Sequence, residues 1–337
     1  MDVDQLQELL DTREGAGTVT VQSVSPIAGG YSRSTARAHM RWTDGTEEDV
    51  ILRGDPEGQA SVFHSDRARE WGVLTTLAGV GGFEVPRPRW FDATGEHMGA
   101  PCIVSEAIDG HSLFSLLRPG EPLDEYRRSF VASMAAIHGT PLDALTSSLP
   151  MPASWEDHMD SFGDRYRALL AACDDTDPVL AYVEAKYRTN RPVAVPLALV
   201  HGDWQPGNVL VRPDGSHVII DWEFTHVGDP REDFGYLMML PFDPDIYYDD
   251  PEAFCQEYRR LSGLTDEHIS PEILEFFKLV GFLTVHEQVL AGLQDLADGQ
   301  DKGPLGPYLV NTATHFAHLI FDVARALPST APAEVAS

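Results

Sequence analysis

Apolar and polar residues alternate along the first hundred residues in the manner of β-strands. Because successive side chains of a strand point to opposite faces, this alternation predicts a sheet. Between two of these segments, residues 66–78 place Trp71, Leu74 and Leu77 at helical spacing. The expected strands lie within 17–53, where alternation runs through 18–21, 35–42 and 49–53, and near 89–91 and 101–105. We therefore expect a β-rich region with one inserted helix.

After residue 108 the apolar positions recur every three or four residues, which is typical of amphipathic helices. The expected helices span 123–138, 153–172, 177–188, 230–240, 251–262, 271–296 and 308–327. The proline-containing segment 328–337 is expected to be a disordered tail. A chain of 337 residues is long enough for two lobes. The pattern predicts an α+β, bilobal fold with a β-rich N-lobe at 1–107 and a mainly helical C-lobe at 108–337.

One stretch interrupts the helical pattern and carries polar side chains in a fixed order. A short apolar strand ends at Val200 and is followed by His-Gly-Asp, with Asp203 last and Asn208 five residues later. Two further apolar runs flank Arg-Pro-Asp-Gly at 212–215, which is typical of a turn between hairpin strands. Such a hairpin would return Asp221, at the end of its second strand, to the end where Asn208 begins the first.

Convergence of Asp203, Asn208 and Asp221 favours one kind of chemistry. Few hard oxygen ligands, with room for phosphate oxygens, suit Mg²⁺. Phosphoryl transfer needs an aspartate to accept the proton of a hydroxyl, and an asparagine and a second aspartate to hold the metal. We therefore interpret Asp203 as the catalytic base and Asn208 and Asp221 as metal ligands. The alternative is that these residues merely cap turns.

The order of these residues resembles the aminoglycoside phosphotransferase family of small-molecule kinases. His-Gly-Asp-x4-Asn is followed by Ile-Asp-Trp-Glu at 220–223 and by Gly-Asp-Pro-x2-Asp at 228–233. The likeness is dense over 199–236 and thinner over roughly 20–107. It implies a protein-kinase-like fold in which the N-lobe binds ATP, with GTP not excluded. It also implies Mg²⁺ as cofactor and a hydroxylated small molecule as acceptor.

The N-lobe offers further candidates for nucleotide binding. Gly29, Gly30 and Ser32 lie between the first two expected strands, where glycines would let backbone N–H groups approach phosphates. Glycine pairs are also ordinary hairpin signals. Backbone groups of Ser105 and Ala107, after the fifth strand, are the candidates for pairing with the edge of the base. Such pairing leaves no side-chain signature, so the choice between ATP and GTP stays open.

The third strand departs from the kinase pattern, which places a lysine there. The chain has three lysines, none before residue 186, and Arg53 ends this strand. An arginine can bind phosphate bidentately, although its fork differs from an ammonium. Glu70, on the following helix, is the candidate partner of Arg53. The alternatives are a solvated strand-end charge for Arg53 and a solvated helical charge for Glu70.

Other polar residues near the motif receive structural interpretations. His201 is expected to support the loop rather than to shuttle protons. Asp233 is expected to hold the segment after the metal ligand by hydrogen bonds. Trp222 is expected to pack in the core. Glu223 is interpreted as a solvated turn charge, with contact to a substrate amine as the alternative.

Charge and composition exclude several classes of partner. The formal net charge is −29, which disfavours nucleic acid and anionic lipid. The N-terminus lacks the pattern of a signal peptide, and the long apolar segment at 271–296 contains charged residues. The three cysteines are widely spaced, without a disulfide or metal pattern. We expect a cytoplasmic protein that uses neither nucleic acid nor membrane as a partner.

The acceptor is the part of the function that the sequence leaves open. Segment 243–252 contains several carboxylates and two tyrosines, which could attract a cationic acceptor, but a solvated acidic loop fits equally well. The preferred function is an ATP- and Mg²⁺-dependent kinase of a small-molecule hydroxyl. Its alternatives are a kinase-like binding protein with weak or no catalysis, suggested by Arg53, and a divalent-metal hydrolase. The sequence does not distinguish antibiotic resistance from a metabolic role.

Overall fold

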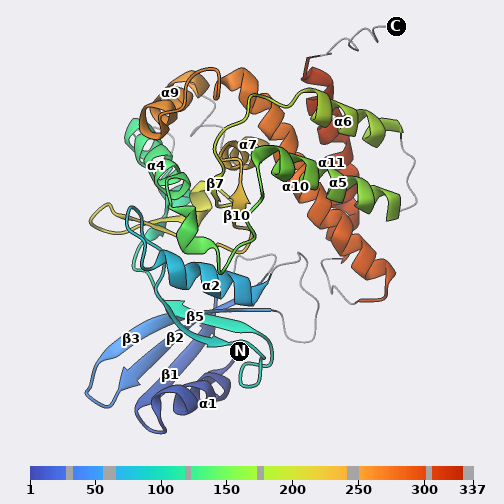
Figure 1. Cartoon of the computed structure of the whole chain (residues 1–337). Coiled ribbons are helices and arrows are strands. Elements are labelled where there is room, and N and C mark those ends of the chain that lie inside the picture. The colour runs from blue at the N-terminus through green and yellow to red at the C-terminus, as the bar shows by residue number, and fades with distance from the viewer. Residues whose placement is uncertain are drawn as a thin grey trace, which may run out of the picture.

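The fold was analysed in a computed structural model, which describes residues 1–27, 33–55, 66–117, 123–172, 178–240, 250–300 and 306–328. Its N-terminal part is an antiparallel five-stranded sheet in the order β1-β2-β3-β5-β4 (Figure 1). The strands are β1 (Val19–Pro26), β2 (Ser34–Trp42), β3 (Glu47–Gly54), β4 (Pro88–Asp92) and β5 (Cys102–Glu106). The predicted N-lobe strands are therefore confirmed, with ends that differ from the prediction by one to several residues.

Two helices flank this sheet. Helix α2 (Arg67–Leu77) is the predicted inserted helix, and it buries Val73, Leu74 and Leu77. Helix α1 (Val3–Glu14) was not predicted. Its start is fixed by a capping box, in which Asp2 accepts from the N–H of Gln5 and the Gln5 side chain accepts from the N–H of Asp2. Such a box satisfies amide groups that have no partner within the first turn, so this signal was present in the sequence.

The C-terminal part is mainly helical, as predicted. Its long helices agree with the expected ranges to within about two residues at most ends. They are α4 (Leu123–His138), α5 (Trp155–Ala172), α6 (Pro178–Thr189), α7 (Arg231–Met239), α9 (Pro251–Ser262), α10 (Pro271–Ala297) and α11 (Gly306–Ala326). Shorter elements that were not predicted are β6 (His111–Ser112), α3 (Leu113–Leu116), η1 (Leu142–Leu145), η2 (Pro206–Asn208) and β10 (His226–Gly228).

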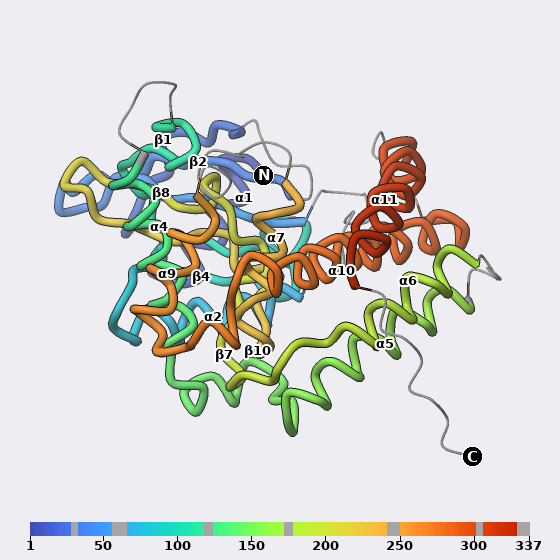
Figure 2. Tube along the Cα trace, turned by 90° about the horizontal axis from the view of Figure 1, so that it is seen from above, coloured from blue at the N-terminus to red at the C-terminus, as the bar shows by residue number. Residues whose placement is uncertain are grey.

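Helix α10 organises the C-terminal part. It contacts α5, α6, α7 and α11, and from above α11 lies on one side of it and α5 with α6 on the other (Figure 2). By length and composition alone, α10 is apolar enough to cross a membrane, which the sequence analysis did not expect. Within the fold, 56% of that apolar window is buried, as is common for the core helix of a globular fold.

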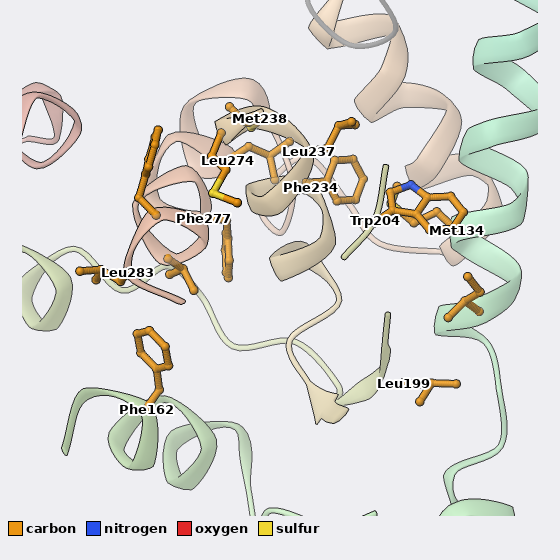
Figure 3. Close-up of a cluster of buried hydrophobic side chains, with 14 of the residues drawn as sticks. Met134, Phe162, Leu199, Trp204, Phe234, Leu237, Met238, Leu274, Phe277 and Leu283 are labelled. Carbon is orange, nitrogen blue, oxygen red and sulfur yellow. The ribbon is translucent and has the colours of Figure 1, made fainter. Parts of the chain in front are cut away.

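Close packing of α7 on α10 anchors the centre of the molecule. A Cβ atom at Gly235 would lie 2.0 Å from the carbonyl oxygen of Phe277, and one at Gly281 would lie 2.6 Å from that of Gly235. Only residues without a side chain allow these backbones to approach so closely. Phe234 and Phe277 are buried beside this contact, within the apolar cluster drawn in Figure 3. The position of α7 matters because it supports the candidate catalytic loop.

Short strands between the two parts carry the motif residues. Strand β7 (Ala198–Val200) pairs with β10 in the antiparallel direction, and the His-Gly-Asp loop follows β7. Strands β6, β8 (Val209–Val211) and β9 (His217–Ile219) form a separate three-stranded sheet. The predicted hairpin is thus confirmed, with Gly215 at φ +84° in its turn. The N–H of Ile219 donates to the carbonyl of Glu84 at 2.8 Å, which connects this hairpin to the segment before β4.

Candidate active site

The His-Gly-Asp loop is fixed by hydrogen bonds from beneath. Asp233, in the first turn of α7 and fully buried, accepts from the backbone N–H groups of His201 at 2.9 Å and Gly202 at 2.8 Å. It also contacts Nε2 of His138 at 2.9 Å. Although burial raises the pKa of Asp233, the contact with His138 contributes to a net lowering. Asp233 therefore holds the loop before Asp203, rather than the segment after the metal ligand as predicted.

His201 has the supporting role that the sequence analysis favoured. Its Nε2 lies 2.9 Å from the carbonyl oxygen of Ile220, and its Nδ1 accepts from the N–H of Asp203 at 3.2 Å. Because a carbonyl can only accept, Nε2 carries the proton. Burial lowers the pKa of His201, which favours this neutral form. The ring thus ties the Asp203 loop to the end of the hairpin.

Asp203 is positioned by two amide side chains. Its Oδ1 accepts from Nε2 of Gln205 at 2.8 Å, and its Oδ2 accepts from Nδ2 of Asn208 at 2.8 Å. Burial and the nearby carboxylate of Asp221 raise the pKa of Asp203 to about 7, against hydrogen bonds from Tyr236 and the two amides. A carboxylate with a pKa near neutrality is suited to accept a proton and release it again.

Asn208 and Asp221 meet at one end of the hairpin, as predicted. The N–H of Ile220 donates to the carbonyl of Asn208 at 3.0 Å, and both side chains line one cleft. Asp221 has φ +69° and is the single non-glycine residue with positive φ in the described chain. Such a conformation costs free energy and persists where the surroundings enforce it, often at functional sites.

Arg53 lies at the centre of the site. Its Nη2 is 2.7 Å from Oδ1 of Asp221, and its Nη1 is 3.4 Å from Oε1 of Glu70. Burial favours the neutral guanidine, but the carboxylates of Asp221 and Glu70 outweigh it and raise the pKa of Arg53. Asp221 in turn has a lowered pKa, because Arg53 overcomes the effect of burial. Arg53 and Glu70 are therefore paired, and neither is the solvated charge of the alternative interpretation.

A network of buried ions behind Arg53 was missed by the sequence analysis. Glu223 is 3% exposed and accepts from Nε of Arg33 and Nη2 of Arg67, each at 2.9 Å. The interpretation of Glu223 as a solvated turn charge was therefore wrong, and its carboxylate is occupied by these two arginines rather than directed at a substrate. Arg67 also pairs with Glu70. One signal was available, because Arg67 and Glu70 are three residues apart on one helix and therefore neighbours.

A cleft of about 540 Å³ separates the sheet from the hairpin. Arg53, Asp221 and Ser105 line this cleft, and Ser105 lies in β5, just before the segment that joins the two parts. The N–H of the other candidate hinge residue, Ala107, donates to the carbonyl of Asp49 at 3.2 Å. This N–H is therefore paired within the sheet, so a contact between Ala107 and a base would have to use its carbonyl, and the roles of Ser105 and Ala107 toward a base stay predictions. Gly29, Gly30 and Ser32 lie outside the described residues.

Most of the acidic segment also lies outside the described residues, which resume at Asp250. The side chain of Asp250 accepts from the N–H of Ala253 at 3.0 Å and so caps the N-terminus of α9. Glu252 pairs with Arg259 at 2.5 Å. These two carboxylates therefore have partners within α9, while the choice between a cationic acceptor and a solvated acidic loop stays open.

Comparison with known proteins places the chain in a family. A sequence model of the phosphotransferase enzyme family matches residues 23–264, more than half of the chain. The mouse acyl-CoA dehydrogenase family member 10 (Mus musculus) is 24% identical over 332 residues, which cover 89% of this chain. The match spans 30% of that relative's length.

Solved structures share the fold at low sequence identity. A macrolide 2′-phosphotransferase from Brachybacterium faecium is 19% identical with a TM-score of 0.61, covering 98% of this chain and 99% of its own. The aminoglycoside phosphotransferase APH(4)-Ia in complex with AMP-PNP and hygromycin B is 15% identical with a TM-score of 0.64, covering 97% and 99%. The α+β, kinase-like fold is thereby confirmed, and the chain belongs to the phosphotransferase enzyme family.

Proposed function

We propose that this protein is a small-molecule kinase that transfers the γ-phosphate of a nucleoside triphosphate to a hydroxyl group, with Asp203 as the base. The observation that carries the proposal is the convergence of Asp203, Asn208 and Asp221 beside one cleft that also contains Arg53. Structural relatives bound to AMP-PNP and GDP support a purine nucleotide as donor. ATP is the proposed donor, with GTP as the alternative.

The residues of this chain divide the chemistry between them. Asp203 would accept the proton of the acceptor hydroxyl as the new O–P bond forms, since Gln205 and Asn208 hold its two oxygens in fixed positions. Arg53 would contact the phosphates, because the described part of the cleft contains no lysine. Glu70 and Glu223 would hold the arginines of the site in place. Precise positioning supplies most of the rate enhancement in phosphoryl transfer.

The oxygen atoms of Asp221 and Asn208 in the cleft fit a magnesium ion. Asp221 offers a carboxylate and Asn208 an amide oxygen, and both residues line the cleft. The amide nitrogen of Asn208 donates to the carbonyl and the carboxylate of Asp203, so its oxygen is the atom left for a ligand. Mg²⁺ prefers hard oxygen ligands completed by phosphates and water. When bound, it would neutralise charge on the transferred phosphate.

Acceptor-dependent release of ADP is the test of this function. A collection of hydroxylated metabolites and antibiotics, including amino sugars and amino alcohols, should be screened with MgATP and with MgGTP. We expect at least one acceptor to give phosphorylated product and ADP in equal amounts, with loss of the signal in EDTA and in Asp203→Asn. Release of ADP that is independent of every acceptor would instead favour a hydrolase.

The pairing of Arg53 with Asp221 supports one second candidate, a kinase-like protein that binds nucleotide without efficient turnover. An arginine in place of the lysine, already bound to the proposed metal ligand at 2.7 Å, could hold the site in an unreactive state. Arg53→Lys distinguishes the two functions. A more active Arg53→Lys variant would favour the binding protein, whereas a loss of activity would show that arginine is the functional cation.

A further inference from the structure

A second cavity adjoins the catalytic loop at Gly202 and shares no lining residue with the nucleotide cleft. It has a volume of about 650 Å³ and is lined by residues of α2, α5, β10, α7 and α10, together with Gly202. Figure 1 shows β10, α7 and α5 next to one another in the C-terminal part. The proposed kinase chemistry uses none of its side chains.

Three side chains of types that can ligate a metal ion converge on this cavity. His158 comes from α5, His226 from β10 and Glu232 from α7, and each of the three lines the cavity. One nitrogen of each histidine and the carboxylate of Glu232 lie within 4.8 Å of one another. Nε2 of His158 is 2.5 Å from Oε1 of Glu232, and Nε2 of His226 is 3.0 Å from Oε2. Two histidines and one glutamate are a common ligand set for zinc with an open fourth position.

The orientation of His226 is the one that a metal ligand needs. Its Nδ1 lies 3.0 Å from the carbonyl oxygen of Phe224. Because a carbonyl only accepts, Nδ1 carries a proton. Nε2 faces a carboxylate oxygen of Glu232, which also only accepts, so Nε2 donates a proton in this structure, and a bound metal would take the place of that proton. A backbone carbonyl bound to the far nitrogen is the usual partner of a metal-bound histidine, since it fixes the ring and its tautomer.

The backbone at Gly228 packs closely against two of the three side chains. A Cβ atom at Gly228 would lie 2.8 Å from Cε1 of His158 and 2.9 Å from Oε1 of Glu232, so a larger residue here would displace the proposed ligands. Ligand atoms of a tetrahedral zinc site are about 3.3 Å apart, given bonds of about 2.0–2.1 Å. The observed nitrogen–oxygen distances of 2.5 and 3.0 Å would therefore need to widen by less than about 1 Å.

We propose that His158, His226 and Glu232 bind a transition-metal ion of the zinc class, with a fourth ligand supplied from the cavity. The ion would join α5 to the β10–α7 connection. Glu232 precedes Asp233, which holds the catalytic loop, so the metal would stabilise the elements that support this loop. The proposal is independent of the kinase function, because its ligands lie outside the nucleotide cleft.

Metal titration of the purified full-length protein tests the site. After treatment with a chelator, we expect one equivalent of Zn²⁺ to bind in competition with a chromophoric chelator, and Co²⁺ to give the visible absorption of a tetrahedral site. His158→Ala and His226→Ala should each weaken binding by about 100-fold or more, since even residues that only support a metal ligand are worth about 10–100-fold. Zn²⁺ should also raise the thermal midpoint of the wild type but not of His158→Ala.

Two controls locate the ion. His39→Ala should leave zinc binding unchanged. His39 also contacts two carboxylates, those of Asp49 and Glu47, but this group has a single imidazole where the proposed site has two. Asp221→Ala should also leave it unchanged, since this carboxylate belongs to the nucleotide cleft. Three outcomes would overturn the proposal: no stoichiometric zinc binding, zinc binding that survives both histidine variants, or zinc binding that is lost in Asp221→Ala. Each would show that the three residues form a hydrogen-bonded triad only.

Discussion

Replacing Asp203 by asparagine should lower turnover and remove a loss of stability that the wild type shows as pH rises. General-base assistance is typically worth about 10²–10⁴ in rate, so turnover with the true acceptor should fall by that factor. The affinity for nucleotide should persist, because Arg53 and Asp221 remain. The effect on stability follows from the charge of Asp203, which burial and Asp221 disfavour.

The magnitude of the stabilisation follows from the two pKa values of Asp203. The carboxyl loses its proton near the ordinary value of 3.8 in the unfolded chain and at about 7 in the folded one. Between these values the folded state binds more protons, so the free energy of unfolding falls as pH rises. At about 1.4 kcal/mol per pKa unit, the loss is about 1.5 kcal/mol at pH 5 and about 4 kcal/mol above pH 7. Asparagine does not ionise and escapes this loss.

Urea unfolding of the wild type and the variant at pH 5 and pH 8, in the absence of ligands, measures this difference. We expect the advantage of Asp203→Asn to grow by about 2–3 kcal/mol between these pH values. Asp266→Asn, at an exposed position, is the matched control and should show no such growth. A variant that gains nothing from pH 5 to pH 8 would show that Asp203 is not destabilised by burial. Turnover that survives in the variant would refute its role as base.

Three further results are expected. Asp221→Ala should abolish Mg²⁺-dependent nucleotide binding and Asn208→Ala should weaken it; unchanged calorimetry with and without Mg²⁺ in Asp221→Ala would contradict the metal assignment. Arg53→Ala should weaken nucleotide binding by at least about tenfold, since charge-assisted hydrogen bonds are worth about 1.5–3 kcal/mol; wild-type affinity would place the phosphate-binding cation elsewhere. Burial lowers the pKa of His286 to about 4. Between pH 6.5 and pH 4 this histidine is therefore protonated in the unfolded chain but not in the folded one. The free energy of unfolding should fall by up to about 3 kcal/mol as the pH is lowered over this range. His286→Gln should flatten this slope relative to the exposed control His315→Gln, and equal slopes would contradict the reasoning.

Local sequence sufficed where short-range geometry decides the structure. The Arg-Pro-Asp-Gly turn at 212–215 fixes a hairpin, and the hairpin alone brings Asp221 back to Asn208. Asp203, five residues before Asn208, then lies close to both. The predicted helices, including α7 (Arg231–Met239), followed for the same reason, because their periodicity is a property of neighbouring residues. Helix α1 (Val3–Glu14) was missed although its capping residues were present.

Tertiary structure alone decided which charges are buried and with what partners. Glu223 looks like a turn residue in the sequence, but Arg33 and Arg67 approach it from segments more than 150 residues away and bury it. The hydrogen-bonded state of Ala107 likewise depends on pairing with a distant strand. The convergence of His158 and His226 requires α5 to pack beside β10. The sequence shows which residues are apolar or charged. Whether a charged residue is desolvated and ion-paired depends on elements that only the folded chain brings together.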